Sequence, residues 1–545
     1  SGGGETPGSG RMSRFRRPSP NLRAPVRRFF AWAAVGLCAA AGEARVVDVT
    51  ILNTTDLHGA LCQSPGVYAE RNDGSLLQCA TIVQRVRAEK PDALLVDCGD
   101  VIQGTAASYL TRGAVMATAM NAMGYDAYVL GNHEFDWGVD ALADFMGKMQ
   151  APALVANLQA GPEAPEVFRR ALPFVVKEID GIRVAIVGLT TPNVPNWTRG
   201  LEARGLGFLD SRLALEHTLP LVRKERPQVM ILLVHQGLLA KDDAANQLNA
   251  IGRRFGEFDL VLGGHLHAVA TRTQLGKVTY AQAGSGAGGV LRVDLAFDTV
   301  QNAVTEKKIE FLPVASDIPE DAAIYAQVAD DLARADQWLG IVVGKTKTDL
   351  TASIALPGLC PVQQLICKAV AATTKAEAVL HDLLSPHGIP AGNVRVADVW
   401  KIVPYENTAG ILWLTPGEIR TILEEGTAYL GTERYFGAWG LRYELHPKAP
   451  PGRRIRKLRA ADGTPINGKK RIPVAFNSYH LSGGGGRFPA IAKAAADPRT
   501  RLQTFDEPVR DMVVDYVRRH RSISIPEGTN AVVVLKEPRA WHRRK

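Results

Sequence analysis

The chain has 545 residues, of which 46% are hydrophobic and 22% are charged. At roughly 100–200 residues per domain this length predicts several domains, and the apolar content excludes a chain that is disordered throughout. A mean hydropathy of −0.04 argues against a polytopic membrane protein.

The net charge of +9 comes from the termini. Residues 1–44 hold seven arginines and two glutamates, and the last ten residues hold five basic residues and one acidic residue. The body is near neutral, so charge gives no reason to expect nucleic-acid binding.

The N-terminal segment has the pattern of an export signal. Met12 is the predicted native start, and a basic stretch then precedes an apolar run from Phe29 to Ala41. That run is shorter than the about 20 residues that a helix needs to span a bilayer, and small residues precede a cut after Ala44. We therefore expect residues 1–44 to be a leader and a cleaved signal peptide of a protein exported to the periplasm or the extracellular space. An uncleaved anchor and a buried helix are the alternatives.

The cysteine content does not predict a disulfide-rich fold. Removal of the signal would take Cys38 and leave five cysteines, an odd number that is too small for a disulfide scaffold. Cys62 and Cys79 could pair in an oxidising compartment. The other three are expected to be small core residues.

From residue 46 to residue 314, short apolar runs alternate with amphipathic stretches. Such alternation predicts a layered α/β domain. The expected buried strands are 46–52, 93–96, 127–130, 184–187, 229–234 and 260–262. The expected helices are 77–89, 105–123 and 139–149. After about residue 277 one strand follows another, as at a sheet edge, over 278–282, 290–297 and 308–314.

A second unit follows a polar, helical connector over residues 316–345. It is predicted to occupy residues 346–537, and a basic tail covers residues 538–545. Helices are expected near 361–373 and 415–426, and strands near 409–414, 441–446 and 471–477.

Polar motifs follow five of the predicted strands. They are Asp56-Leu57-His58, Asp97-Cys98-Gly99-Asp100, Gly131-Asn132-His133-Glu134-Phe135-Asp136, Val234-His235-Gln236-Gly237 and Gly263-Gly264-His265-Leu266-His267. Side chains at the carboxyl ends of strands converge on one crevice of a layered α/β sheet. Each motif alone is weak, since a lone histidine after a strand is more often a core residue. Five motifs in this order are not expected by chance.

The converging side chains are of metal-ligand types. They are Asp56, His58, Asp100, Asn132, His235, His265 and His267. Carboxylates, imidazoles and an amide oxygen together suit borderline divalent ions such as zinc, manganese, cobalt or iron, and suit neither a thiolate zinc site nor an all-oxygen calcium site. Seven ligands are too many for one tetrahedral ion. Two ions about 3.5–4 Å apart that share a carboxylate would account for all seven ligands, and phosphoryl hydrolysis uses such a pair of ions.

The five motifs, in order and spacing, resemble the calcineurin-like metallophosphoesterases, and specifically the bacterial, exported two-domain 5′-nucleotidase family. Pro404-Tyr405-Glu406-Asn407-Thr408 is a further stretch similar to that family. The resemblance covers about residues 46–510. It implies a four-layer αββα metallophosphoesterase sandwich over residues 45–315 and a smaller α/β 5′-nucleotidase C-terminal domain over residues 346–537.

The resemblance also implies a role for each polar residue. The first of two divalent ions would be bound by Asp56, His58, Asp100 and His267, and the second by Asn132, His235 and His265, with Asp100 bridging them. His133 would be a catalytic residue that stabilises the transition state and assists the leaving group, and Asp136 would orient its ring. A trapped water of lowered pKa would give a metal-bridging hydroxide that attacks phosphorus in line, with no covalent nucleophile.

In the resembled family the second domain binds the nucleoside, with two aromatic rings around the base and arginines from a Gly-Gly-x-Arg turn. Tyr435, with Phe436 as a close alternative, and Phe488 match the two rings. Stacking of a base contributes roughly 1–3 kcal/mol, although both rings could be only core residues. The turn reads Leu383-Leu384-Ser385-Pro386 here, without an arginine. Arg487 is the candidate replacement, so a 5′-nucleotide substrate is less firmly implied than phosphoester hydrolysis.

We therefore expect an exported dinuclear metal-dependent phosphohydrolase whose partner is a small-molecule phosphoester substrate, first of all a nucleotide. No nucleic-acid partner is expected, and no membrane contact beyond an N-terminal anchor if the signal stays attached. A cyclic phosphodiesterase, another phosphomonoesterase or a thiosulfohydrolase-like enzyme with the same metal site is the alternative. A non-catalytic binding protein would lack ligands or the His133–Asp136 pair, and the sequence keeps them.

Overall fold

The structure is a computed structural model, and it describes residues 45–63, 74–353, 360–466 and 468–525. The predicted signal peptide (1–44) and basic tail (538–545) lie outside the described residues. Within the described ranges, no helix combines the length and the apolar character that crossing a bilayer requires. Cys62 and Cys79 are both free thiols, so the pairing considered above is not formed.

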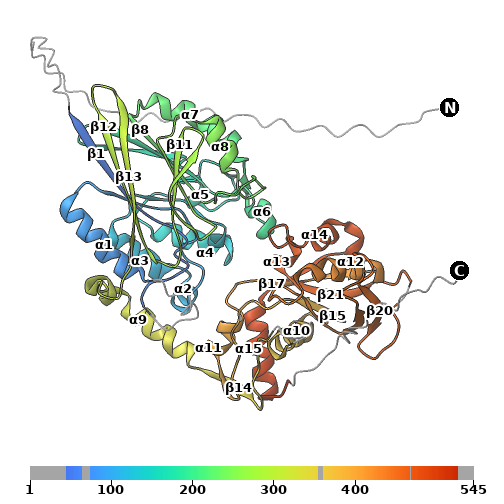
Figure 1. The fold of residues 1–545 in the computed structure, drawn as a ribbon. Coiled ribbons are helices and arrows are strands. Elements are labelled where there is room, and N and C mark those ends of the chain that lie inside the picture. Colours follow the sequence, from blue (N-terminus) through green and yellow to red (C-terminus); the bar gives the residue numbers. More distant parts are fainter. Residues whose placement is uncertain (1–44, 64–73, 354–359, 467, 526–545) are drawn as a thin grey trace, which may run out of the picture. The chain divides into compact units, whose positions relative to one another are not determined.

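The N-terminal part is built on two central sheets (Figure 1). One sheet has the strand order β13-β12-β1-β2-β3, with bounds β1 Val46–Thr54, β2 Leu94–Asp97, β3 Ala127–Tyr128, β12 Gly289–Asp298 and β13 Ala303–Pro313. The other has the order β10-β11-β9-β8-β6-β5, with bounds β5 Phe174–Ile179, β6 Ile182–Leu189, β8 Val229–Val234, β9 Leu260–Gly263, β10 Val269–Leu275 and β11 Val278–Ala283. One hydrophobic cluster includes residues of both sheets, such as Ile51 of β1 and Ile231 of β8, so the sheets pack face to face.

Helices cover the outer face of each sheet. Those on the first sheet are α1 Leu76–Glu89, α2 Ala106–Thr111, α3 Ala114–Met123 and α4 Gly138–Lys148. Those on the second sheet are α7 Ser211–Lys224 and α8 Leu248–Arg254. The predicted four-layer αββα sandwich is therefore confirmed.

Local sequence explains most of these elements. The Ser75 side chain accepts a hydrogen bond from the Gln78 N–H and so caps the N-terminus of α1. Strand β8 is apolar and buried along its whole length because both of its faces are covered. The predicted helix 105–123 is in fact two helices, since the chain turns at Arg112 (φ 51) and Gly113 (φ 81). A Cβ at Gly113 would lie 2.6 Å from the Ile102 side chain, so packing as well as backbone conformation requires glycine there.

The C-terminal part follows helix α9 (Ala322–Leu339), which lies within the predicted connector. Its main sheet has the order β18-β15-β21-β17-β22, with bounds β15 Ala378–His381, β17 Thr408–Leu414, β18 Gly437–Trp439, β21 Ile472–Asn477 and β22 Gln503–Pro508. Helices α10 (Pro361–Thr374) and α15 (Val509–His520) belong to the hydrophobic cluster on one face. Helices α12 (Pro416–Gly426) and α14 (Pro489–Ala496) belong to the cluster on the other.

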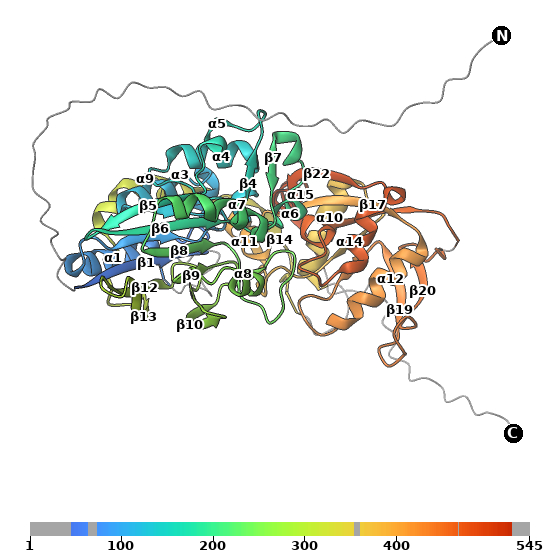
Figure 2. The same ribbon diagram turned by 90° about the horizontal axis from the view of Figure 1, so that it is seen from above.

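Shorter elements complete both parts. Strand β20 (Ile455–Ala460) lies beside α12 in both views (Figures 1 and 2). The remaining elements are β4 Leu158–Ala160, β7 Leu206–Phe208, β14 Val342–Thr346, β16 Gly392–Arg395, β19 Leu441–Leu445, β20 Ile455–Ala460, β23 Ser522–Ile523, α5 Glu166–Arg169, α6 Val194–Trp197, α11 Val396–Ile402, α13 Ser478–Leu481 and 3-10 turns that include η2 His133–Phe135.

Candidate metal centre

Every predicted ligand follows the carboxyl end of a strand, and the structure brings all seven into one region. Asp56 and His58 follow β1, Asp100 follows β2 and Asn132 follows β3, three neighbouring parallel strands. His235 follows β8, while His265 and His267 follow the adjacent parallel strand β9 of the other sheet. The packed sheets therefore place ligands on both sides of one crevice.

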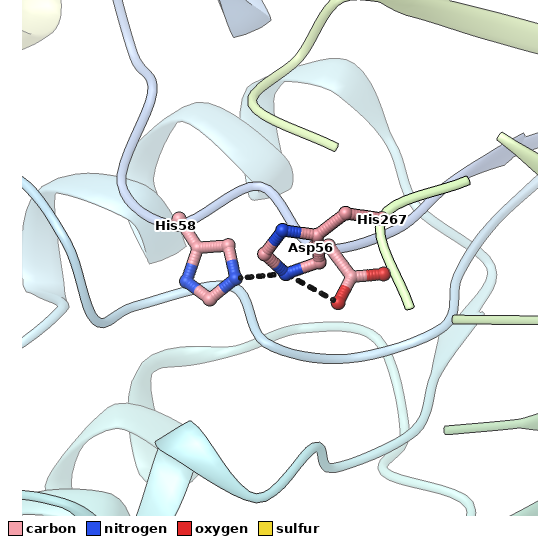
Figure 3. Close-up of side chains that lie close together, drawn as sticks. All are labelled: Asp56, His58 and His267. Carbon is pink, nitrogen blue, oxygen red and sulfur yellow. Dashed lines mark hydrogen bonds and ion pairs between the residues drawn. The ribbon is translucent and has the colours of Figure 1, made fainter. Parts of the chain in front are cut away.

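Asp56, His58 and His267 form the first ligand group (Figure 3). Nε2 of His267 lies 3.5 Å from Oδ1 of Asp56 and 3.0 Å from Nε2 of His58. One ligand atom from each residue lies within 4.8 Å of the other two. Three donors this close together fit a single divalent cation.

Asp100, His235 and His265 form the second ligand group. Nε2 of His235 lies 3.1 Å from Oδ2 of Asp100 and 3.2 Å from Oδ1 of Asn132. The same Oδ2 of Asp100 lies 4.0 Å from Nε2 of His58, which belongs to the first group. Asp100 therefore stands between the two groups, in the position of a shared carboxylate.

The backbone of the ligand residues is unusual. Left-handed φ angles cost non-glycine residues about 1–3 kcal/mol each, and such residues cluster at functional sites. The backbone N–H of His265 donates to the Asp56 carboxylate, 3.0 Å from each oxygen, and so ties the β9 loop to the β1 loop. Five of the seven ligand residues have such angles: Asp56 (50°), His58 (48°), Asp100 (57°), His265 (73°) and His267 (57°).

Backbone carbonyls orient two of the imidazoles. Nδ1 of His58 lies 3.0 Å from the carbonyl oxygen of Gln103, and Nδ1 of His235 lies 2.7 Å from that of Cys98. Because a carbonyl oxygen only accepts, Nδ1 carries the proton in both rings. In the neutral ring, Nε2 is thereby left with a lone pair that can bind a metal.

Burial and the neighbouring carboxylates together set the charge of these groups. Burial opposes the charged form of His235, but Asp100 raises the pKa of that ring to about 9. Burial raises the pKa of Asp56 to about 7. It also lowers the pKa of His58 to about 4 and that of His265 to about 3. A divalent cation would take the place of protons as the counter-charge and would leave the imidazoles neutral, which is the form that binds metal. Two carboxylates, an amide oxygen and four imidazoles fit zinc, manganese, cobalt or iron.

His133 lies beside the ligand groups, with its ring centroid 5.4 Å from that of His58. The 3-10 turn η2 brings Asp136 within reach, and Nδ1 of His133 lies 2.8 Å from Oδ2 of Asp136. Burial by itself lowers the pKa of His133, but the carboxylates of Asp136 and Asp100 raise it to about 10. A protonated imidazole at this place can donate to an oxygen that gains negative charge.

A cavity of about 1250 Å³ opens over the centre. It is lined by Asn132, His133, Asp136 and His265, and by several segments of the C-terminal part, including 382–386 and 405–409. Small-molecule sites have volumes of about 300–1,000 Å³, so the cavity can hold a ligand of that class.

The three residues predicted to bind substrate lie in different surroundings. Arg487 lines the cavity, and its guanidinium contacts the hydroxyl and the ring face of Tyr479. Tyr435 is 7% exposed and its hydroxyl lies 2.9 Å from that of Tyr443. Phe488 is 0% exposed, with its ring centroid 4.6 Å from that of Phe436. Both rings thus belong to the hydrophobic core of the C-terminal part in this structure.

Two residues near the centre had no predicted role. Glu134 is 1% exposed and accepts hydrogen bonds from the loops that follow β2 and β3. Its position within the His133 motif was the available signal. Trp197 lines the cavity, with its ring centroid 5.5 Å from that of His265, and no sequence signal distinguishes it.

Comparisons with known proteins match two separate segments of the chain to two family models. The family model for calcineurin-like phosphoesterases matches residues 49–269, and the model for the 5′-nucleotidase C-terminal domain matches residues 342–493. A 5′-nucleotidase from Bos taurus is 27% identical in an alignment of 494 positions that covers 81% of this chain and 84% of that protein. A 5′-nucleotidase from Homo sapiens is also 27% identical, over 85% of this chain and 87% of its own.

A solved structure shares the fold. The crystal structure of a 5′-nucleotidase precursor from Thermus thermophilus superposes with a TM-score of 0.66 and 22% identity, covering 90% of this chain and 100% of that chain.

Proposed function

Since the chain belongs to the two-domain 5′-nucleotidase family of the calcineurin-like phosphoesterases and is a metal-dependent phosphoester hydrolase, we propose that it hydrolyses nucleotide phosphoesters at a dinuclear metal centre. The observation that carries the dinuclear proposal is the position of Asp100. Its Oδ2 lies 3.1 Å from Nε2 of His235 and 4.0 Å from Nε2 of His58, so one carboxylate reaches both ligand groups.

The ligands divide between two ions according to their groups. Asp56, His58 and His267 would hold the first ion, Asn132, His235 and His265 would hold the second, and Asp100 would serve both. A bound pair of divalent ions lowers the pKa of water and neutralises charge on a phosphoryl group.

His133 is the proposed catalytic residue. It lines the cavity beside Asn132, and its protonated ring is held by Asp136. From that place it donates a hydrogen bond to the phosphoryl oxygens and a proton toward the leaving oxygen. Asp136 keeps the ring protonated and fixes its orientation, because Nδ1–H is directed at the carboxylate.

A nucleotide is the proposed substrate. The cavity volume and the names of the similar proteins support it, and Arg487 offers a cation on the cavity wall. The ring residues Tyr435 and Phe488 stay part of the proposal as candidates for contact with the base. Because both are buried here, such contact would require a rearrangement that exposes their rings.

A substrate profile tests the proposal. Initial rates are measured with 5′-AMP, UDP-glucose, 2′,3′-cyclic AMP and an aryl phosphate, each with added Mn²⁺, Zn²⁺ or Co²⁺. We expect the highest kcat/KM with 5′-AMP, and loss of all four activities in Asp100→Ala. Turnover of the aryl phosphate alone would contradict a nucleotide substrate while leaving phosphoester hydrolysis in place.

One observation favours a different substrate at the same centre. Residues 383–386 line the cavity without an arginine, where the resembled family has a Gly-Gly-x-Arg turn. A cyclic phosphodiesterase, another phosphomonoesterase or a thiosulfohydrolase-like enzyme is therefore the second candidate. A higher kcat/KM for 2′,3′-cyclic AMP than for 5′-AMP in the same profile would favour the cyclic phosphodiesterase.

Export is also proposed, from the order of basic, apolar and small residues in 12–44. N-terminal sequencing of the protein recovered outside the cytoplasm of an expressing bacterium tests it, and a mature N-terminus at Arg45 is the expected result.

A further inference from the structure

The carboxylate of Glu134 is surrounded by backbone N–H groups. Its Oε2 accepts from Asp100 at 2.8 Å and from Gly131 at 2.5 Å. Its Oε1 accepts from Val101 at 2.6 Å and from Ile102 at 3.2 Å. The side chain is 1% exposed, so these four hydrogen bonds take the place of water around the group.

The four donors come from two different loops. Asp100, Val101 and Ile102 follow β2, and Gly131 lies in the loop after β3 that also carries Asn132 and His133. One buried carboxylate therefore joins the loop that carries Asp100 to the loop that carries Asn132.

The two loops approach so closely that their relative position has little freedom. A Cβ at Gly131 would lie 2.1 Å from Oδ1 of Asp100 and 2.4 Å from its backbone nitrogen, so only glycine fits. The backbone N–H of His133 donates to the same Oδ1 at 2.8 Å. Oδ1 of Asp100 is thereby turned toward the β3 loop, and Oδ2 is left toward His58 and His235.

Asp100 needs external support for its backbone. Its φ of 57° is left-handed, a conformation that a residue with a Cβ rarely adopts unless its surroundings impose it. The N–H groups of Asp100 and of the next two residues all end on Glu134. Among the described residues, no other single side chain accepts hydrogen bonds from three successive N–H groups of this loop.

We propose that Glu134 is a positioning residue that holds Asp100 in its left-handed conformation and fixes the β2 and β3 loops at the separation at which both ligand groups share Asp100. This inference rests on the proposed dinuclear centre. Glu134 touches neither substrate nor metal in this role, and it acts through the geometry of the ligands. Partners of this kind typically change metal affinity 10–100-fold when they are removed.

Three variants separate positioning from charge. Glu134→Gln removes the charge and one acceptor oxygen at nearly constant volume. Glu134→Asp keeps the charge but shortens the side chain by one methylene, so its carboxylate no longer reaches all four donors. Glu178→Gln, at an exposed position of β5, is the matched control.

The first measurement is the apparent affinity and stoichiometry for Mn²⁺, by competition with a chelator. We expect two ions in the wild type, a loss of about 10–100-fold in both Glu134 variants, and a change below about twofold in the control. If Glu134→Asp binds Mn²⁺ as tightly as the wild type, the reach of the side chain does not affect metal affinity. That result would overturn the proposed positioning role. A wild type that binds no Mn²⁺ would instead contradict the proposed function.

The second measurement does not depend on bound metal, and the result that would overturn the inference comes from the wild type alone. In the metal-free wild type, hydrogen exchange of the amides of Asp100, Val101, Ile102 and Gly131 should be slow, although these residues lie outside helices and strands. Exchange as fast as at exposed loop glycines such as Gly200 would overturn the inference, whatever the metal content. Slow exchange in the wild type and faster exchange in Glu134→Gln, at an unchanged Tm, is the result that supports it.

Discussion

Nδ1 of His133 lies 2.8 Å from Oδ2 of Asp136, and the two residues are three positions apart at one 3-10 turn. The negative carboxylate keeps the imidazole protonated, with a pKa raised to about 10 despite burial. A proton donor loses its activity as pH rises through its pKa, so a raised pKa extends activity to alkaline pH. We expect Asp136→Asn to lower the His133 pKa and to move the alkaline limb of the kcat profile to lower pH.

The same pair allows a comparison of rates. General acid catalysis contributes about 10²–10⁴-fold, and His133→Ala should lose about that factor in kcat while its metal content stays as in the wild type. Asp140→Asn, an exposed acid in α4, is the control and should keep wild-type kinetics. An unchanged kcat in His133→Ala would remove this residue from the proposed mechanism.

Removal of metal should affect stability as well as rate. Carboxylates and imidazoles lie within 4.8 Å of one another in each ligand group, and a cation that binds only the folded chain stabilises it by mass action. At metal concentrations about 100 times the Kd this amounts to about 2.7 kcal/mol. Dialysis against a chelator is expected to abolish activity and lower the Tm, and Mn²⁺, Zn²⁺ or Co²⁺ should restore both. A protein indifferent to chelation would contradict the proposed centre.

Substitution of Phe488 should change the stability of the protein, whereas substitution of Arg487 should change substrate binding. Phe488 is 0% exposed, so Phe488→Ala should lower the free energy of unfolding by about 3–5 kcal/mol in urea titrations. Arg487 lines the cavity, and Arg487→Ala should raise KM for 5′-AMP with little change in stability. A large rise of KM in Phe488→Leu at an unchanged free energy of unfolding would instead place the ring against substrate.

His381 should make stability depend on pH. Its ring is fully buried beside Asp382 and His480, and burial lowers its pKa from 6.5 to about 4. Between these values the unfolded chain binds a proton that the folded chain does not, so the free energy of unfolding falls as pH falls from 6.5 toward 4. The full effect is about 3 kcal/mol.

Urea unfolding of the metal-free protein at several pH values checks this. His381→Gln should flatten the decline relative to the wild type, and His217→Gln, at an exposed position, should not. Equal slopes in the wild type and His381→Gln would assign the decline to other groups.

Much of the architecture follows from local pattern. The apolar run 229–234 corresponds to β8 (Val229–Val234), and the run 77–89 corresponds closely to α1. The sequence of such a segment indicates its burial, since a continuous apolar run must be covered on both faces. The amphipathic helix α7 and the strand β5 were not predicted. Helix α7 contains Pro220, a residue that argues against a helix interior, and β5 does not alternate strictly between buried and exposed positions.

The ligand types, and their place after strands, were also present in the amino-acid sequence by itself. The resemblance implied that Asp100 bridges the two ligand groups. Only the tertiary structure decided how far its Oδ2 lies from Nε2 of His58 and of His235, and that Glu134 joins two loops. It also decided that Phe488 is buried, and that the predicted helix 105–123 is interrupted at Arg112, where Gly113 packs closely against Ile102. The physical reason is that sequence encodes what each segment must bury, whereas distances between residues far apart in the chain are set by how the sheets and loops pack.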